Sequence, residues 1–333
     1  MIDLHLHLDG SLDEQDFLYL AKKDGIDLGK DFPNNIYVPK DCPSLEVYLE
    51  RFALPCLLLE SKENLKHVAN SLVRRLDQMG YLYAEIRFAP QLHTGKGLSQ
   101  MDAALAVIDG VNDALKTCHN LYDANVILCC MRHAPKEVNL ETIEVANKLK
   151  GTKAVAVDLA GAEALHPSSY YKEIFDLAKQ YKLNITIHAG EATGSDEVMM
   201  ALDNGATRIG HGVHLSLDDE TVKRVKDNNI CFEFCPTSNL QTKSLKTYKD
   251  VPIMEFLKRD IAVTVNSDNM TVSNTDVYQE FSHLIQTFKM SKDDVHRLLT
   301  NSIEHAFVDD KEKEKLKEIL EQKFEKFYGQ INI

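Results

Sequence analysis

Histidines and carboxylates of this sequence stand at spacings that could hold a metal ion. The first group, near the N-terminus, reads His5-Leu6-His7-Leu8-Asp9 and alternates polar with apolar residues. In a β-strand, this alternation places the two histidines and the aspartate on one face and the leucines on the other. Two imidazoles on one strand face can reach the same ion, and neutral histidine nitrogen is a good zinc ligand. The segment therefore predicts part of a metal site.

Three further polar groups follow apolar runs later in the chain. They read His188-Ala189-Gly190-Glu191, Gly210-His211-Gly212 and Asn266-Ser267-Asp268-Asn269. The glycines in the first two groups would let a ligand or the backbone approach closely. Histidine nitrogen and carboxylate oxygen without thiolate form a donor set that suits zinc best and leaves manganese, iron and cobalt open. We therefore expect a metal site that draws its ligands from several distant segments.

Eight apolar runs with the composition of β-strands contain or precede these groups. They span residues 1–8, 82–89, 125–131, 153–159, 184–188, 207–211, 230–234 and 261–265. From the third run onward, the starts are about 23 to 31 residues apart, which leaves room for a strand, a helix and two short loops. Eight such units predict an α/β fold, a (β/α)8 TIM-type barrel. The polar groups then lie at the strand ends, where barrels hold their active sites.

An open, doubly wound sheet is the alternative arrangement of the same units. It usually carries a GxGxxG turn after the first strand, whereas residues 9–11 of this chain read Asp-Gly-Ser. No linker-like stretch divides the chain, so we expect a single domain over residues 1–333. The long gap after the first run and the long segment after the last run predict extra helices. We expect lid helices at about 32–80, after the first strand, and C-terminal helices at about 276–328.

The composition of the whole chain excludes several classes of protein. Lys and Arg number 38 and Asp and Glu number 51, so the net charge is 38 − 51 = −13, which opposes binding to nucleic acid. No apolar run is long enough to predict a membrane span, and the first residues show no signal-peptide pattern. Seven scattered cysteines form neither a disulfide framework nor a CxxC zinc motif. We therefore expect a cytoplasmic protein with buried free thiols, and the oligomeric state stays open.

The polar groups together carry a family resemblance. The segments HLHLDGS at 5–11, DLAG at 158–161, HAGE at 188–191, GHG at 210–212 and SD at 267–268 occur in the order and at roughly the distances seen in adenosine deaminases. The chain thus resembles that branch of the amidohydrolase superfamily. The resemblance implies a zinc-bearing barrel that converts adenosine and deoxyadenosine to inosine or deoxyinosine and ammonia, in purine salvage. The partner it implies is a small nucleoside, with neither nucleic acid nor a membrane involved.

The resemblance also implies catalytic roles. One zinc ion per chain would be held by His5, His7, His188 and Asp268. Such an ion lowers the pKa of a bound water to about 7, and Asp268 could accept a hydrogen bond from that water. Glu191 would donate a proton to purine N1, which activates C6 of the ring. His211 would lie near the water as a base or as an electrostatic stabiliser, two roles that the sequence does not separate.

Further residues are implied as contacts of the substrate. Asp9 would bind the ribose 5′-hydroxyl, Gly161 would offer its backbone N–H to purine N3, and Asn269 would face purine N7. A helix expected at 44–59 carries an apolar stripe at i, i+3, i+4 and i+7. The stripe consists of Leu45, Tyr48, Leu49 and Phe52. It reads equally well as a plain core stripe or as a lid over the purine.

Two departures from the family pattern bear on the substrate. Many members carry a second aspartate where this chain has Asn269; the amide donates to N7 at any pH, whereas an aspartate must first be protonated. Adenine-specific relatives tend to carry glutamate in place of Asp9, so the aspartate favours a ribosyl substrate. Deamination of adenine or of a modified adenosine is the alternative. A non-catalytic nucleoside-binding protein would need a lost catalytic group, and every expected position is filled.

Overall fold

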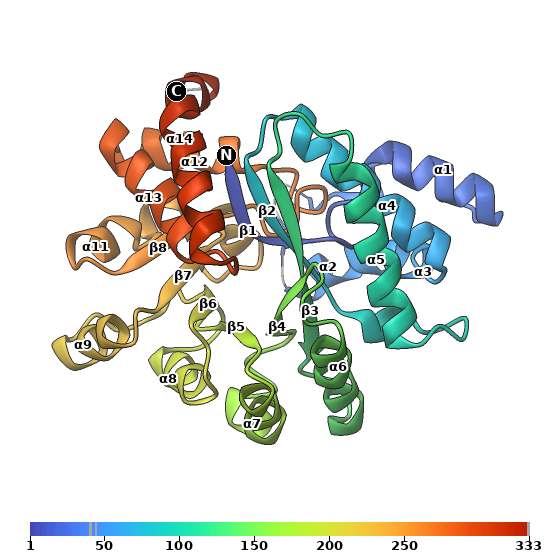
Figure 1. The fold of residues 1–333 in the computed structure, drawn as a ribbon, viewed down its shortest axis with the longest axis horizontal. Helices are drawn as coiled ribbons and strands as arrows, with labels where there is room; N and C mark the ends of the chain where they lie inside the picture. The colour runs from blue at the N-terminus through green and yellow to red at the C-terminus, as the bar shows by residue number, and fades with distance from the viewer. Residues whose placement is uncertain (40–41, 44, 332–333) are drawn as a thin grey trace.

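The strands of this protein form a nearly closed barrel surrounded by helices, as the computed structural model in Figure 1 shows. The structure describes residues 1–39, 42–43 and 45–331. All eight strands are parallel and pair in sequence order. They are β1 (Ile2–His7), β2 (Tyr83–Phe88), β3 (Asp123–Met131), β4 (Ala154–Ala160), β5 (Asn184–Ala189), β6 (Arg208–His211), β7 (Cys231–Phe234) and β8 (Ala262–Val265). The predicted TIM-type (β/α)8 barrel is confirmed.

The last strand meets the first through a short contact beyond the end of β8. Leu6 and Asp268 form an isolated parallel bridge. The His7 N–H donates to the Asp268 carbonyl at 2.7 Å, and the Asp268 N–H donates to the His5 carbonyl at 2.9 Å. Barrel closure therefore brings the polar group after β8 directly against the histidines of β1.

Helices follow each strand and cover the outside of the barrel (Figure 1). In the first half they are α1 (Glu14–Asp24), α2 (Leu45–Leu49), α3 (Ala53–Leu58), α4 (Lys62–Gln78), α5 (Gln100–Leu115) and α6 (Lys136–Lys148). In the second half they are α7 (Lys172–Gln180), α8 (Ser195–Asp203), α9 (Asp219–Asp227), α10 (Pro236–Gln241), α11 (Ile253–Lys258), α12 (Val277–Phe288), α13 (Lys292–Glu304) and α14 (Asp310–Gln330). The last three are the expected C-terminal helices.

Helix α4 illustrates how local sequence produces this outer layer. The Ser61 side chain caps its first turn by accepting from the Asn64 N–H. Leu65, Leu72 and Leu76 recur at helical spacing and are fully buried. The helix packs against α5, so its apolar face joins the core.

The lid segment between α1 and α4 is less regular than the single helix expected at 44–59. It consists of α2, a 3-10 turn at Glu50–Phe52 and α3. Pro55 lies in the first turn of α3 and has no backbone N–H to donate to an earlier turn, so a continuous hydrogen-bonded helix cannot run through it.

Among the residues that the structure describes, no helix is long and apolar enough to cross a membrane.

Candidate active site

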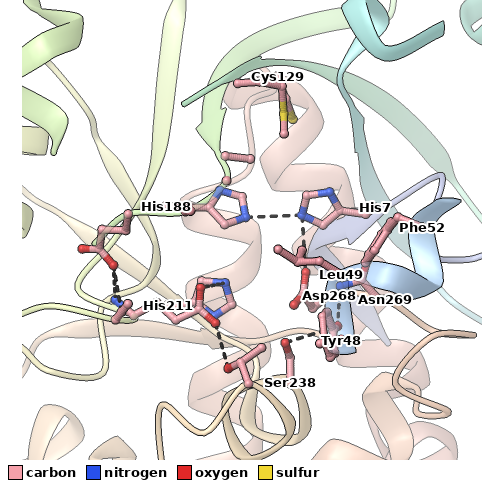
Figure 2. Close-up of a pocket in the computed structure, with 18 of the residues that line it drawn as sticks. His7, Tyr48, Leu49, Phe52, Cys129, His188, His211, Ser238, Asp268 and Asn269 are labelled. Atoms are coloured by element: carbon pink, nitrogen blue, oxygen red, sulfur yellow. Dashed lines mark hydrogen bonds and ion pairs between the residues drawn. The ribbon is translucent and has the colours of Figure 1, made fainter. Parts of the chain in front are cut away.

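Four side chains with metal-binding atoms converge at the carboxyl end of the barrel. They are His5 and His7 from β1, His188 from β5 and Asp268 after β8, and their ligand atoms all lie within 4.8 Å of one another. Figure 2 shows the Nε2 atoms of His7 and His188 facing each other, at 3.3 Å. Asp268 Oδ1 lies 3.4 Å from His5 Nε2 and 3.3 Å from His7 Nε2. The structure thus brings together all four residues predicted as ligands.

Buried carboxylates hold two of these imidazoles by their other ring nitrogen. Glu233 Oε2 lies 2.8 Å from His5 Nδ1, and Asp158 Oδ2 lies 3.0 Å from His188 Nδ1. A carboxylate accepts the Nδ1–H, so the Nε2 lone pair is left facing the cluster. Both rings are therefore held in the tautomer that can bind a metal ion.

One guanidinium joins the two carboxylates. Arg87 donates to Asp158 at 3.0 Å and to Glu233 at 2.8 Å, and all three side chains are fully buried. On the other side, Arg208 donates to Glu233 and to Glu85, each at 2.6 Å. Buried charges are tolerated only when they are paired, and charge-assisted bonds of this kind are rigid. The ligand rings therefore rest on a network of ion pairs inside the barrel.

The cluster fits a divalent cation. Burial lowers the pKa of His5 and places that of His7 well below its ordinary value, so both rings favour the neutral form that ligates. Burial opposes ionisation of Asp268, but the imidazoles of His5, His7 and His211 beside it keep the pKa of its carboxyl well below the usual range. His5 Nε2 is buried and has no hydrogen-bond partner among the described residues. Lone pairs gathered this closely are stabilised when a cation lies between them.

A second, overlapping group shares His5 and Asp268 and adds His211 and Cys235. The Cys235 thiol lies 3.6 Å from the Glu233 carbonyl, and burial raises its pKa well above the ordinary value. A thiol that keeps its proton is a poor ligand. The set with three histidines and one aspartate therefore fits a metal ion better, and its nitrogen-rich donors suit zinc.

Two of the site residues have unusual backbone conformations. His211 has φ 63° and Asp268 has φ 59°, in the left-handed region that residues other than glycine rarely adopt. Strain of this kind is commonly stored at functional sites. Before His211, a Cβ on Gly210 would meet His5 Cε1 at 3.0 Å, which explains the glycine. The strand ends are therefore shaped to bring imidazoles together.

His211 is oriented towards Glu191. The Asn239 amide Nδ2 lies 3.1 Å from His211 Nδ1, so that nitrogen accepts and Nε2 carries the hydrogen. His211 Nε2 lies 3.6 Å from Glu191 Oε2, and the Thr242 hydroxyl donates to Glu191 Oε1 at 3.1 Å. A proton on either group is therefore within short reach of the other and of a ligand in the pocket.

A pocket of about 470 Å³ opens over the metal-binding cluster (Figure 2), within the range of small-molecule sites. Its walls include the residues predicted to contact the substrate, namely Asp9, Gly161, Asn269, Tyr48 and Leu49, together with Glu191 and His211. Apolar side chains complete the walls: Phe52, Cys56, Ala89, Leu92, Cys129 and Met131. An apolar cavity with a few convergent polar groups is the form expected of a site for a small organic molecule.

Asp9 combines burial with an unused acceptor. Only 6% of the residue is exposed, and among the described residues its Oδ1 has no hydrogen-bond partner. Burial raises the pKa of its carboxyl to about 6. Such a group gains a partner when a ligand hydroxyl enters the pocket.

Tyr48 connects the lid to the barrel. Its side chain is 3% exposed, and its hydroxyl accepts from the Asn269 amide at 2.8 Å and lies 2.9 Å from Ser273 Oγ. Leu49 borders the pocket but is 47% exposed. The side chain of Leu45 lies outside the described part of the structure. Tyr48, Leu49 and Phe52 thus border the pocket, while Tyr48 and Phe52 also pack in a small apolar cluster with Val38 and Val272.

Some residues of the site carried no recognisable signal in the sequence. Arg87 and Glu233 lie inside regular strands, where a charged residue among apolar neighbours was the only sign of a buried role. His214 borders the pocket, with Nε2 3.3 Å from Ser244 Oγ. His93, the other histidine near a strand end, is buried against Phe88 and is absent from the pocket walls.

A barrel with a histidine and aspartate cluster at the carboxyl ends of its strands, beneath an apolar pocket, defines the class of metal-dependent hydrolases with this fold. The chain belongs to the adenosine deaminase family, whose sequence pattern matches residues 1–323. A protein named adenosine deaminase from Haemophilus ducreyi is 43% identical over an alignment of 333 positions that covers 97% of this chain and 96% of that protein. Family and cluster together imply a metal cofactor.

Solved structures share the fold at lower identity. Adenine deaminase from Arthrobacter aurescens superposes with a TM-score of 0.88 at 23% identity, over 97% of this chain and 98% of that one. An amidohydrolase from Burkholderia ambifaria, solved with bound zinc, has a TM-score of 0.87 at 19% identity, over 99% and 92% of the two chains. Both similarities show that this chain shares the barrel fold of those proteins.

Proposed function

We propose that this chain is a zinc-dependent hydrolase that converts adenosine and 2′-deoxyadenosine to inosine or deoxyinosine and ammonia, in cytoplasmic purine salvage. One domain over residues 1–333 would hold one zinc ion. The observation that carries the proposal is the position of the four-residue cluster, at the floor of a nucleoside-sized pocket, in a chain of the adenosine deaminase family.

His5, His7, His188 and Asp268 would hold the zinc ion. When bound, zinc supplies Lewis acidity that lowers the pKa of water to about 7. The reaction forms a C6–O bond on the purine and breaks the C6–N bond of the amine, which leaves as ammonia after protonation. Other side chains of the pocket would transfer the protons and orient the purine ring.

Glu191 and His211 are the groups we assign to proton transfer. Glu191 would give a proton to purine N1, which makes C6 more electrophilic. His211 would accept a proton from the attacking water or stabilise the charge that develops there. The 3.6 Å between His211 Nε2 and Glu191 Oε2 supports this pairing, because both face the same part of the pocket.

The pocket walls supply contacts for a ribosyl substrate. Asp9 offers its unpartnered oxygen to the 5′-hydroxyl, Gly161 its backbone N–H to N3, and Asn269 its amide to N7. A buried carboxylate at the ribose end would repel a 5′-phosphate, so an uncharged nucleoside suits the pocket better than a nucleotide.

The test compares wild-type protein with Glu191→Gln on a panel of adenosine, deoxyadenosine, adenine and N6-methyladenosine. Loss of the adenine absorbance gives kcat and KM, and metal analysis gives zinc per chain. We expect adenosine to be among the best substrates and Glu191→Gln to keep zinc while losing kcat by on the order of 10² or more. A preference for adenine or the modified nucleoside would support the alternative substrates. A near wild-type rate for Glu191→Gln would remove the N1 proton role.

A further inference from the structure

A buried carboxylate in the wall of the pocket accepts four hydrogen bonds from one short loop. Glu163 lies after β4 and is 4% exposed. Its Oε1 accepts from the Gly190 N–H at 2.6 Å and from the Thr193 hydroxyl at 2.7 Å. Its Oε2 accepts from the N–H groups of Glu191 at 3.0 Å and Ala192 at 2.8 Å. One side chain thus binds four consecutive residues around the proposed proton donor.

The loop would not hold this shape by its own backbone bonds. Gly190 has φ 69°, and a Cβ there would meet Val198 Cγ2 at 2.6 Å, so the turn requires glycine at a tight contact. The three N–H groups after β5 point the same way, towards the carboxylate, as in the backbone concavities that bind anions. Glu163 therefore supplies the anion that this concavity needs.

The carbonyl side of Glu191 is held as well. Ser244 donates its hydroxyl to the Glu191 carbonyl, and Thr242 donates to the Glu191 carboxylate. With Glu163 on the N–H side, the peptide units on both sides of Glu191 are bound, and its side chain has a defined direction into the pocket. A displacement of about 1 Å at such a group can cost two orders of magnitude in rate.

We propose that Glu163 is a positioning residue that fixes the Gly190–Thr193 loop and thereby sets the position of the Glu191 carboxyl for proton transfer. The inference rests on the proposed function only through the role of Glu191. Both carboxylate oxygens of Glu163 are engaged by the loop, so we assign it a role through the loop rather than on the substrate.

The substitution Glu163→Gln tests the inference because each oxygen accepts two donors. A glutamine can serve one pair through its remaining oxygen, whichever way the amide is turned, and its NH2 group faces the other pair, whose donors lose their acceptor. We expect kcat to fall about 10- to 100-fold, with KM changed less than about threefold and zinc per chain unchanged. Faster hydrogen–deuterium exchange of the peptide with residues 190–193 should accompany the loss.

Glu197→Gln is the matched control. Glu197 is also buried, at 5% exposure, and accepts the Ser168 N–H at 2.8 Å, but it makes no hydrogen bond to the Gly190–Thr193 loop among the described residues. The control should lose thermal stability to a similar extent while kcat and exchange at 190–193 stay near wild type. Equal kcat losses in both variants would show that Glu163 contributes only general stability, and would overturn the inference.

Two further variants keep the test decisive. Thr193→Ala removes one of the four bonds without stranding a backbone donor, so it should fold and lower kcat about two- to fivefold even if Glu163→Gln does not fold. Combined with Glu191→Gln, Glu163→Gln should cause no further loss of kcat, because both act through one group. If the kcat losses of the two single variants multiply in the double variant, the positioning role is overturned. Wild-type hydrogen–deuterium exchange at 190–193 in Glu163→Gln would overturn it as well.

Failure of the two proposals is distinguishable. If Glu191→Gln keeps the wild-type kcat, the proton role of Glu191 is wrong. The exchange measurement still tests whether Glu163 holds the loop, because it does not depend on the reaction. If Glu191→Gln is inactive and Glu163→Gln is wild type in both kcat and exchange, the inference about Glu163 alone is wrong.

Discussion

The metal-binding cluster and the lid border the same pocket and are built differently. The cluster comes from strand ends, and its rings are held by buried carboxylates such as Asp158 and Glu233. The lid consists of short helical pieces. Among the described residues, it meets the loop after β8 through the Tyr48 hydroxyl, through a backbone hydrogen bond from Val38 to Val272 and through apolar contacts. Buried charges on rigid strands determine the first region, whereas the second depends more on apolar packing and on neutral hydrogen bonds.

This difference predicts that the two regions have separate roles, the cluster in metal binding and rate and the lid in substrate binding. Changes in the cluster should remove metal and rate together, because the ligand atoms are interdependent at distances near 3.3 Å. Changes in the lid should alter substrate binding while leaving the metal in place.

Replacing a ligand should have the largest effect. We expect Asp268→Ala to lose bound zinc and to lower kcat/KM by on the order of 10³ or more, since both the charge and a ligand oxygen are removed. Metal analysis of the purified variant and an absorbance assay check this. Full zinc content in Asp268→Ala would contradict the assignment of Asp268 as a ligand.

Replacing the Arg87 guanidinium, which lies behind the cluster, should have the second-largest effect. Arg87→Lys keeps the charge but cannot reach both Asp158 and Glu233 with a planar fork, so the rings of His188 and His5 lose their fixed orientation. We expect zinc affinity to fall about 10- to 100-fold in competition with a chelator.

Arg224→Lys, at an exposed ion pair with Asp203, is the control and should bind zinc as wild type does. Equal affinity in both variants would break the link between the network and the metal.

Truncation of the lid tyrosine should have a smaller and different effect. We expect Tyr48→Ala to raise KM for adenosine about tenfold with zinc content intact, because it removes a wall of the pocket and leaves the Asn269 amide without its partner. Tyr48→Phe keeps the ring and should raise KM only about two- to fivefold. An unchanged KM in Tyr48→Ala would show that the lid does not contact the substrate.

The outer face of the lid should matter least. Leu57 lies in α3 and is 46% exposed. Leu57→Ser should leave kcat, KM and zinc content within about twofold of wild type, as surface substitutions usually do. A KM increase as large as that of Tyr48→Ala would mean that the whole lid, rather than its inner stripe, determines substrate binding.

The barrel strands were predictable because their signal is local. The run expected at 82–89 is observed as Tyr83–Phe88, and the run at 184–188 as Asn184–Ala189. Apolar residues buried on a pleated surface leave a pattern within a few positions of sequence. The lid was predicted less well, since the expected helix at 44–59 breaks at the 3-10 turn and Pro55, and its position over the pocket depends on contacts with distant loops.

The candidate site divides in the same way. His5 and His7 were identifiable because a strand of period two puts both on one face, and Asp268 because it follows a strand. Glu163 and Arg87 were not identifiable from the sequence, since each is a single charged residue whose partners lie far away along the chain. Arg87 and Glu233, for example, are 146 positions apart. Nothing in a local pattern specifies pairing over that separation.

Local sequence was therefore enough to establish eight strands, their inward faces and the chemical types available at their ends. Folding decided which of those groups meet. The His5 ring is held by Glu233, 228 residues away, because barrel closure sets β1 and β7 around the same interior. Strand periodicity acts over a few residues, whereas the closure that sets side chains about 3 Å apart exists only once the whole sheet has formed.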